Sequence, residues 1–206
     1  FPSGELTSLT AKIGDRSSTR TVLREADGKI LWDEYDRISV YAGSMDRSVF
    51  QAEVSTEATS ATFTGKLDLS GMEEGDWIYA VYPCSERDSC RNGMLSVPIG
   101  GERNYYSDVQ QTLAAQYVTP HNLYEFPMVA RSQDSELSFF NVCGGIRFTV
   151  ANEQIISVIF KNLDGSPIAG DAQVTFDAEG HPVIDLITNG MDEIWTRPGY
   201  VDDDYP

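Results

Sequence analysis

The most reactive side chains in this sequence are three cysteines and two histidines. Cys84 and Cys90 flank a short polar turn, so they could close a small disulfide loop, which would indicate an oxidising compartment. Two free thiols in a loop explain the same spacing equally well, and both alternatives stay open. His121 and His181 each stand beside a proline, and neither has a histidine or cysteine at metal-ligand spacing. We therefore predict no metal site.

Other residue combinations that support catalysis are missing from the sequence or occur by chance. There is neither a Gly-x-Ser-x-Gly nucleophile elbow nor a glycine-rich phosphate loop. With 32 aspartates and glutamates, some pair will have a glycosidase-like separation by chance, and no pair stands out. The run Asp202, Asp203 and Asp204 offers oxygen ligands for calcium but is more typical of a solvated tail. We predict no catalytic residue, no cofactor and no enzymatic activity.

The aromatic residues allow a binding function as well as a structural one. Trp32, Trp77 and several tyrosines could line a platform for a sugar ring. Aromatic residues at inward positions of strands more often belong to the core, because they bury a large apolar surface. Carbohydrate binding is therefore kept as the alternative.

Charge and composition restrict the class of partner. The formal net charge is 15 − 32 = −17, which argues against nucleic acid and against anionic membrane surfaces as direct partners. Hydrophobic residues make up 41% of the chain, enough for a folded core. No apolar run approaches the length of a membrane span. The opening Phe1 to Gly4 is a poor natural start, so we expect that a targeting segment has been removed.

The element that organises the predicted fold is the long alternating stretch from Leu137 to Val150. Leu137 and Phe139 alternate with polar or outward residues, and the pattern restarts after Gly144 and Gly145 with Phe148 on the inward face. The two glycines indicate a bend or bulge inside a strand rather than its end. We expect this strand to be half buried, with neighbouring strands on either side.

Shorter alternating segments separated by turn signals predict the rest of the architecture. We predict strands at 6–13, 30–32, 37–42, 50–54, 61–65, 77–83, 94–98, 126–130, 155–160, 167–176 and 181–186. Helix-like spacing occurs only between Tyr105 and Tyr117, where one or two helical turns are expected. Clear βαβ spacing is missing. The prediction is an all-β chain folded as an antiparallel β-sandwich or barrel.

Four groups of segments occur in a distinctive order. They are 19–23 with 30–33 and 36–41, then 61–65 with 78–83, then 128–130 with 137–148, and finally 156–160 with 168–170. They resemble the fimbrillin family of Bacteroides-type surface pilins, the Mfa-like proteins, and the resemblance covers roughly Thr19 to Asp185. Glu34 and Tyr35 depart from the pattern, because a glycine is common there in the family.

The resemblance implies a location, a fold and a role. Members are exported to the cell outer membrane and surface, often as lipoproteins whose lipidated cysteine precedes the mature fold, so contact with the membrane would be through an N-terminal lipid anchor outside this chain. They fold as two transthyretin-like β-sandwich domains. By that pattern residues 1–150 form a complete sandwich, and residues 151–206 form the start of a second, short or truncated one. Members build, cap or anchor fimbriae, adhere to surface glycans or proteins, and promote biofilm formation.

The resemblance also implies how subunits assemble. In polymerising members a trypsin-like protease cuts after an arginine near the N-terminus, removes the first strand and opens a groove for a strand of another subunit. Arg16, Arg20 and Arg24 follow the predicted strand 6–13 and are the candidate processing sites. The first strand stays in place in the alternative of an anchor, tip or non-polymerising member. A carbohydrate-binding surface lipoprotein of the same fold is the alternative function.

Overall fold

The structure, a computed structural model, describes residues 4–14, 31–32, 34, 36–42, 46–54, 58–99, 127–143 and 158–196. This part of the chain is all-β, as predicted. Its strands are β1 (Glu5–Ile13), β2 (Arg37–Ala42), β3 (Ser48–Glu53), β4 (Ser60–Asp68), β5 (Ile78–Tyr82), β6 (Ser89–Arg91), β7 (Met94–Ile99), β8 (Met128–Ser132), β9 (Glu136–Asn141), β10 (Val158–Lys161), β11 (Ala169–Phe176), β12 (Pro182–Met191) and β13 (Glu193–Thr196). No helix in it is long and apolar enough to cross a membrane.

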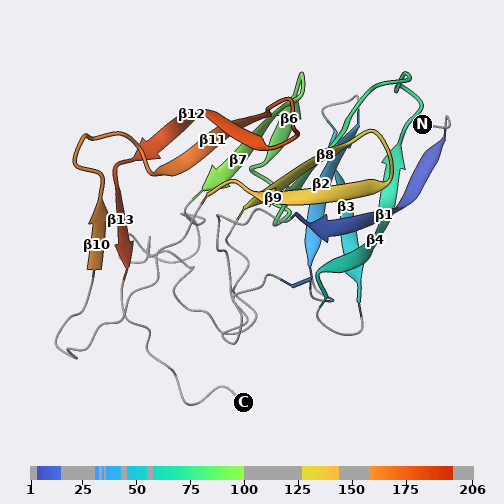
Figure 1. Ribbon diagram of the computed structural model, residues 1–206, viewed down its shortest axis with the longest axis horizontal. Helices are drawn as coiled ribbons and strands as arrows, with labels where there is room; N and C mark the ends of the chain where they lie inside the picture. The colour runs from blue at the N-terminus through green and yellow to red at the C-terminus, as the bar shows by residue number, and fades with distance from the viewer. Residues whose placement is uncertain are drawn as a thin grey trace, which may run out of the picture.

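Seven of the described strands form one closed sheet in the order β1-β4-β3-β2-β5-β8-β9 (Figure 1). Neighbouring strands are antiparallel except at the closure, where β1 runs parallel to β9. The strand pattern allowed a sandwich or a barrel, and the sandwich implied by the resemblance did not include this closure. Alternation shows which face of a strand is buried, but it does not show which edges meet when no short turn joins them. Residues far apart in the chain make this contact, so the sequence pattern could not reveal it.

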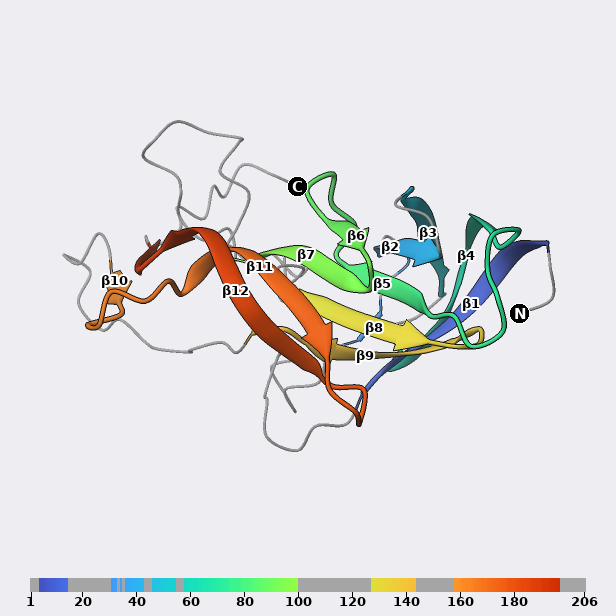
Figure 2. The same cartoon turned by 90° about the horizontal axis from the view of Figure 1, so that it is seen from above.

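A four-stranded sheet in the order β12-β11-β7-β6 packs beside the barrel (Figure 2). Strand β11 pairs with β7 from Gly170 opposite Ile99 to Val174 opposite Leu95. The boundary expected between residues 1–150 and 151–206 therefore does not separate two sheets, because β7 and β11 come from opposite sides of it. Strands β10 and β13 form a separate two-stranded sheet.

Local sequence explains where several strands bend and turn. Asn92 and Gly93 have positive φ values of 51° and 76°, the conformation of a tight hairpin turn, and they join β6 to β7. Strand β4 continues past Gly65, where we expected a strand to end. A Cβ atom at Gly65 would lie 2.6 Å from the carbonyl oxygen of Val49, so the close crossing of β4 and β3 requires glycine.

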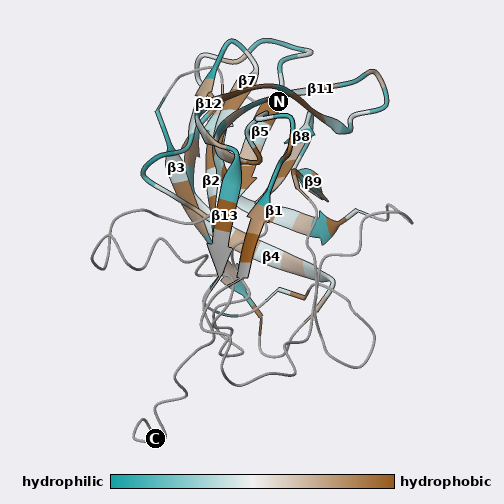
Figure 3. Cartoon of the chain, turned by 90° about the vertical axis from the view of Figure 1, so that its left-hand side faces the viewer, coloured by the Kyte–Doolittle hydropathy of each residue, from teal (hydrophilic) through white to brown (hydrophobic). Residues whose placement is uncertain are grey.

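Two hydrophobic clusters hold the sheets together. The barrel interior contains Trp32, whose ring makes edge-to-face contacts with Phe63, Tyr82 and Phe139 at centroid distances of 5.0, 5.2 and 5.3 Å. The second cluster lies between the barrel and the four-stranded sheet and includes Val174 of β11. Figure 3 shows hydrophobic positions interspersed with hydrophilic ones along the strands, the pattern of sheets with one face on a core.

Strand β9 occupies the first half of the stretch on which the sequence prediction centred. Leu137 and Phe139 are buried in the barrel, as the alternation predicted, and β9 has β8 and β1 as neighbours. The restart of the pattern at Gly144 and Gly145, the predicted burial of Phe148 and the predicted helical turns between Tyr105 and Tyr117 fall outside the described residues.

Candidate functional site

Strand β1 occupies the seam at which the barrel closes. On one side it pairs antiparallel with β4, with Leu9 opposite Phe63 and Ala11 opposite Ala61. On the other side it pairs parallel with β9, with Ala11 opposite Leu137. The first strand of the chain is therefore the only described link between β4 and β9.

The amphipathic pattern of β1 determines how the strand is held. Leu9 and Ala11 are buried in the barrel core, and Leu6 and Ile13 pack against that core partly buried. Lys12 faces outward, where its Nζ lies 2.6 Å from Glu136 Oε2 on β9 in an exposed ion pair. Exposed ion pairs contribute little to stability. Apolar contacts and backbone hydrogen bonds therefore retain β1.

The two edges of β1 are paired to different extents. The pairing with β4 runs from Glu5 to Lys12, whereas the pairing with β9 covers only Thr10 to Ile13. The first half of β1 thus has a single described strand partner. The second half of β1, which ends next to Gly14, is therefore the more tightly held half.

Gly14 fixes the point where the chain leaves the barrel. Its N–H donates a hydrogen bond to the carbonyl of Phe139, with an N···O distance of 2.7 Å. A Cβ atom at Gly14 would lie 2.5 Å from Cε1 of Phe140, and the Phe140 ring in turn meets the His181 ring edge-on with centroids 5.2 Å apart. Arg16, Arg20 and Arg24, the candidate processing sites, follow directly in the chain and fall outside the described residues.

The loop between the two cysteines is held by a carboxylate. Cys84 and Cys90, the possible disulfide pair, are both free in the structure. Burial raises the pKa of the Cys90 thiol to about 11, which keeps it protonated and unreactive near neutral pH. Its side chain belongs to the second hydrophobic cluster, which accounts for that burial.

Asp88 is the buried residue around which this loop is organised, and the sequence pattern did not identify it. Its carboxylate accepts hydrogen bonds from Ser39 Oγ at 2.8 Å, from the Tyr41 hydroxyl and from the Ser85 N–H at 2.8 Å. Burial raises the pKa of Asp88, and burial together with this carboxylate raises the pKa of Tyr41. The arrangement joins the loop to β2.

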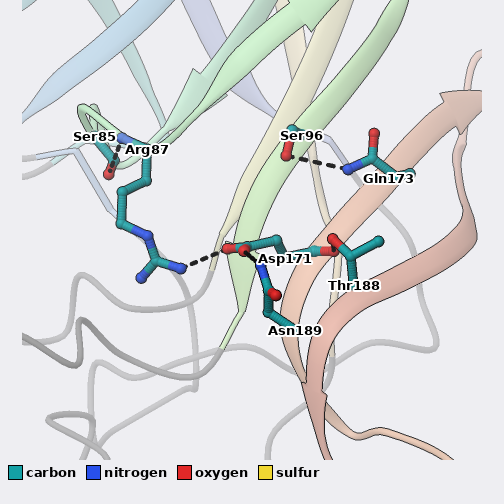
Figure 4. Close-up of polar contacts among 7 residues, drawn as sticks. All are labelled: Ser85, Arg87, Ser96, Asp171, Gln173, Thr188 and Asn189. Carbon is teal, nitrogen blue, oxygen red and sulfur yellow. Dashed lines mark hydrogen bonds and ion pairs between the residues drawn. The ribbon is translucent and has the colours of Figure 1, made fainter.

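A second polar cluster joins the same loop to the four-stranded sheet (Figure 4). Arg87 Nη2 lies 2.5 Å from Asp171 Oδ1, and Asn189 Nδ2 donates to Asp171 Oδ2 at 2.9 Å. Gln173 Nε2 donates to Ser96 Oγ at 3.2 Å, between neighbouring strands β11 and β7. These polar groups bond to one another across the sheet, which indicates a structural role.

Trp32 and Trp77, the tryptophans named for a sugar platform, both pack against other side chains. Trp32 has an exposed fraction of 0% and lies inside the barrel. One face of the Trp77 ring is covered by the Arg131 guanidinium, which lies 4.4 Å from the ring centroid. A sugar needs an open aromatic face, so Trp32 offers no platform, and Trp77 offers at most one face of its ring.

The remaining candidate ligands show no metal site within the described part of the chain. His181 Nδ1 lies 3.4 Å from Asp177 Oδ2, and the other predicted candidates, His121 and Asp202 to Asp204, fall outside the described residues. No group of three or more histidine, cysteine, aspartate or glutamate side chains among the described residues could hold a metal ion. Within that part of the chain, the seam at β1 is the feature best suited to a function.

Comparisons with known proteins add no further information, because no family model, no curated protein and no solved structure matches the chain. The resemblance to fimbrillins stays a prediction. The geometry around β1 is therefore the basis for a functional proposal.

Proposed function

We propose that this protein is a structural or adhesive subunit of cell-surface fimbriae that assembles by β-strand exchange at the position of β1. The observation that carries the proposal is the place of β1, an amphipathic first strand that alone joins β4 to β9 in the described barrel. In this proposal the closed sheet is a transthyretin-like sandwich whose two halves meet at β1. The subunit is exported and functions at the cell outer membrane, in the fimbrium.

Removal of β1 would create a binding site with two chemical components. The facing edges of β4 and β9 would present unpaired N–H and C=O groups, which bind an incoming strand through backbone hydrogen bonds. The positions of Leu9 and Ala11 would become an apolar groove lined by Phe63, Ala61 and Leu137. A strand from another subunit satisfies both components at once, as in strand-addition complexes.

The energetics favour a groove that is filled by a strand. Burying a side chain the size of Leu9 contributes about 1.5–3 kcal/mol, and each regained hydrogen bond adds about 0.5–1.5 kcal/mol. An open groove therefore destabilises the isolated subunit and drives association with a new strand. Surface adhesion and biofilm formation would follow from the resulting fibre.

Limited trypsin digestion of the folded chain tests the proposal. We expect cleavage after Arg16, Arg20 or Arg24, followed by release of the fragment that contains β1 and by formation of oligomers. Mass spectrometry identifies the cut, and gel filtration detects the oligomers. A variant with all three arginines changed to glutamine is the matched control and should remain uncut there and keep its starting size.

Two outcomes would contradict the proposal. One is a chain that resists cleavage in 15–24 while trypsin cuts elsewhere. The other is a chain that is cut there but keeps β1 and does not assemble. The second outcome would support the alternative in which the first strand stays in place permanently.

A further inference from the structure

Strand β12 is the long outer edge of the four-stranded sheet. It spans Pro182–Met191 and pairs with β11, and no other described strand pairs with its far side. Figure 2 shows it along the margin of the sheet, with β11 between it and β7. An unpaired edge presents backbone N–H and C=O groups that can bind another strand.

The side chains of β12 are unusually apolar for an exposed edge. Val183, Ile184 and Leu186 are 41%, 40% and 57% exposed, and they lie within four consecutive positions of one strand. Natural edge strands are commonly protected by lysines or by an internal proline. Among the ten residues of β12 the one ionisable side chain is Asp185, and its proline is the first residue.

The register shows that both faces of this edge carry apolar groups. Ile184 lies opposite Val174, whose side chain is buried in the second hydrophobic cluster, so Ile184 is on the core side of the sheet. Leu186 lies opposite Gln173, on the outer side. A strand that adds to β12 must therefore bring apolar residues on both of its own faces.

We propose that β12 is a docking edge for β12 of a second copy of this chain, which pairs with it antiparallel about a two-fold axis. A second β12 has the required apolar residues on both faces and the same ten-residue length. The other edge of the same sheet is β6, which has three residues and would leave most of β12 uncovered. Self-pairing also closes the contact, so it gives a dimer and no open-ended array.

Charge sets the conditions under which this dimer forms. Each copy carries a net charge of −17, so two copies repel one another at long range. The contact itself adds little repulsion, because Asp185 is the one charged side chain that each β12 brings to it. Salt screens the long-range part over about 8 Å at physiological ionic strength. Dimerisation should therefore strengthen as salt is added, the opposite of the trend for a basic partner.

Sedimentation velocity on the full, uncleaved chain tests this inference at low and at physiological salt. We expect a monomer–dimer equilibrium that shifts toward the dimer at the higher salt. Leu186→Lys should weaken dimerisation by about tenfold or more, because it places a charge on each side of the two-fold contact. Leu163→Lys is the matched control, since Leu163 is a leucine with 95% exposure in a turn outside β12, and it should leave the equilibrium within about twofold.

Hydrogen exchange identifies the surface that is covered. The amides of β12 should exchange more slowly as the protein concentration rises, and this dependence should disappear in Leu186→Lys. Three results would overturn the inference: a monomer at both salt concentrations, equal weakening by the two leucine substitutions, or slow exchange of β12 that does not depend on concentration. Circular dichroism of both variants establishes that they are folded. Because the uncleaved chain keeps β1 in place, the outcome is independent of the trypsin experiment.

Discussion

Trp32 fills the interior of the barrel although its own segment contributes only an isolated β-bridge to Ala58. The ring contacts residues from β4, β5 and β9, so it holds three parts of the closed sheet around one side chain. The sequence pattern predicted a short strand here, and it allowed Trp32 to be either a core residue or part of a platform for a sugar ring. The contacts that bury Trp32 decide between these roles, and they come from segments that are distant in the chain.

Trp32→Ala should therefore destabilise the fold more than most substitutions. We expect a loss of about 3–5 kcal/mol, because the change removes a fully buried aromatic ring and leaves a cavity. Trp32→Phe should cost less, since it keeps an aromatic ring and removes an Nε1–H that is buried without a hydrogen-bond partner among the described residues. Urea unfolding followed by circular dichroism measures both. Equal losses for the two variants would contradict this account of the cavity.

Asp88 gives a residue-scale prediction about pH. Burial raises its pKa in the folded state above the value in the unfolded chain. Protonation of Asp88 at low pH therefore favours the folded state, and this contribution is lost as the pH rises from the unfolded pKa through the raised folded pKa. Asp88→Asn should remove the contribution. The difference in unfolding free energy between wild type and variant should change with pH across that window.

The measurement is urea unfolding of both proteins at a series of pH values below and above the ordinary pKa of aspartate. Backbone hydrogen bonds are the first cause of the lowered pKa values of Asp68 and Asp177. These two groups make the stability of both proteins fall at low pH, which opposes the effect of Asp88. Subtracting the unfolding free energy of the variant from that of wild type removes this shared contribution. A difference that does not vary with pH would show that the Asp88 carboxylate has no shifted pKa. Asp88→Ala should lower stability at every pH, since it leaves buried donors from Ser39 and Tyr41 unpaired.

At the scale of elements, the sequence predicted strands best where apolar residues recur at every second position. Strand β2 matches the predicted bounds, and its alternating residues Ile38, Val40 and Ala42 are buried in the barrel core. Strand β6 was missed because its three residues are too few for a period to appear. The end of β12 was missed because its residues are partly exposed on both faces, so the polar–apolar alternation fails while the pairing with β11 continues.

Gly14 provides the test for how β1 is held. Gly14→Ala should destabilise the protein by about 1–3 kcal/mol, because the new Cβ displaces the Phe140 ring from its contact with His181. Gly71→Ala is the matched control, since no atom lies within 4 Å of a Cβ built there. Thermal unfolding compares the two variants. If Gly14→Ala were as stable as Gly71→Ala, the exit of β1 would not be tightly packed.

At the scale of the molecule, the arrangement of the two sheets decides whether the chain behaves as one unit. Tyr41 of β2 and Val81 of β5 come from the barrel, yet they are buried in the second cluster with Val97 and Val174 of the four-stranded sheet. Strands β2 and β5 are thus covered on both faces, by the barrel interior and by the second cluster. A division at residue 150 follows from family resemblance and chain length, but neither shows that β11 returns to pair with β7.

Val174→Ala tests this coupling, because Val174 is buried and belongs to β11, a strand that lies beyond the expected boundary. We expect a single urea transition in wild type, reported at the same midpoint by tryptophan fluorescence, to which the Trp32 environment in the barrel contributes, and by far-ultraviolet circular dichroism, which reports all strands. The substitution should lower stability by about 1–3 kcal/mol and move both midpoints equally. Two separate transitions, or a shift confined to one probe, would mean that the sheets unfold independently. Coincident shifts would mean that a change beyond residue 150 is felt by the barrel that holds β1, because both sheets share the second cluster.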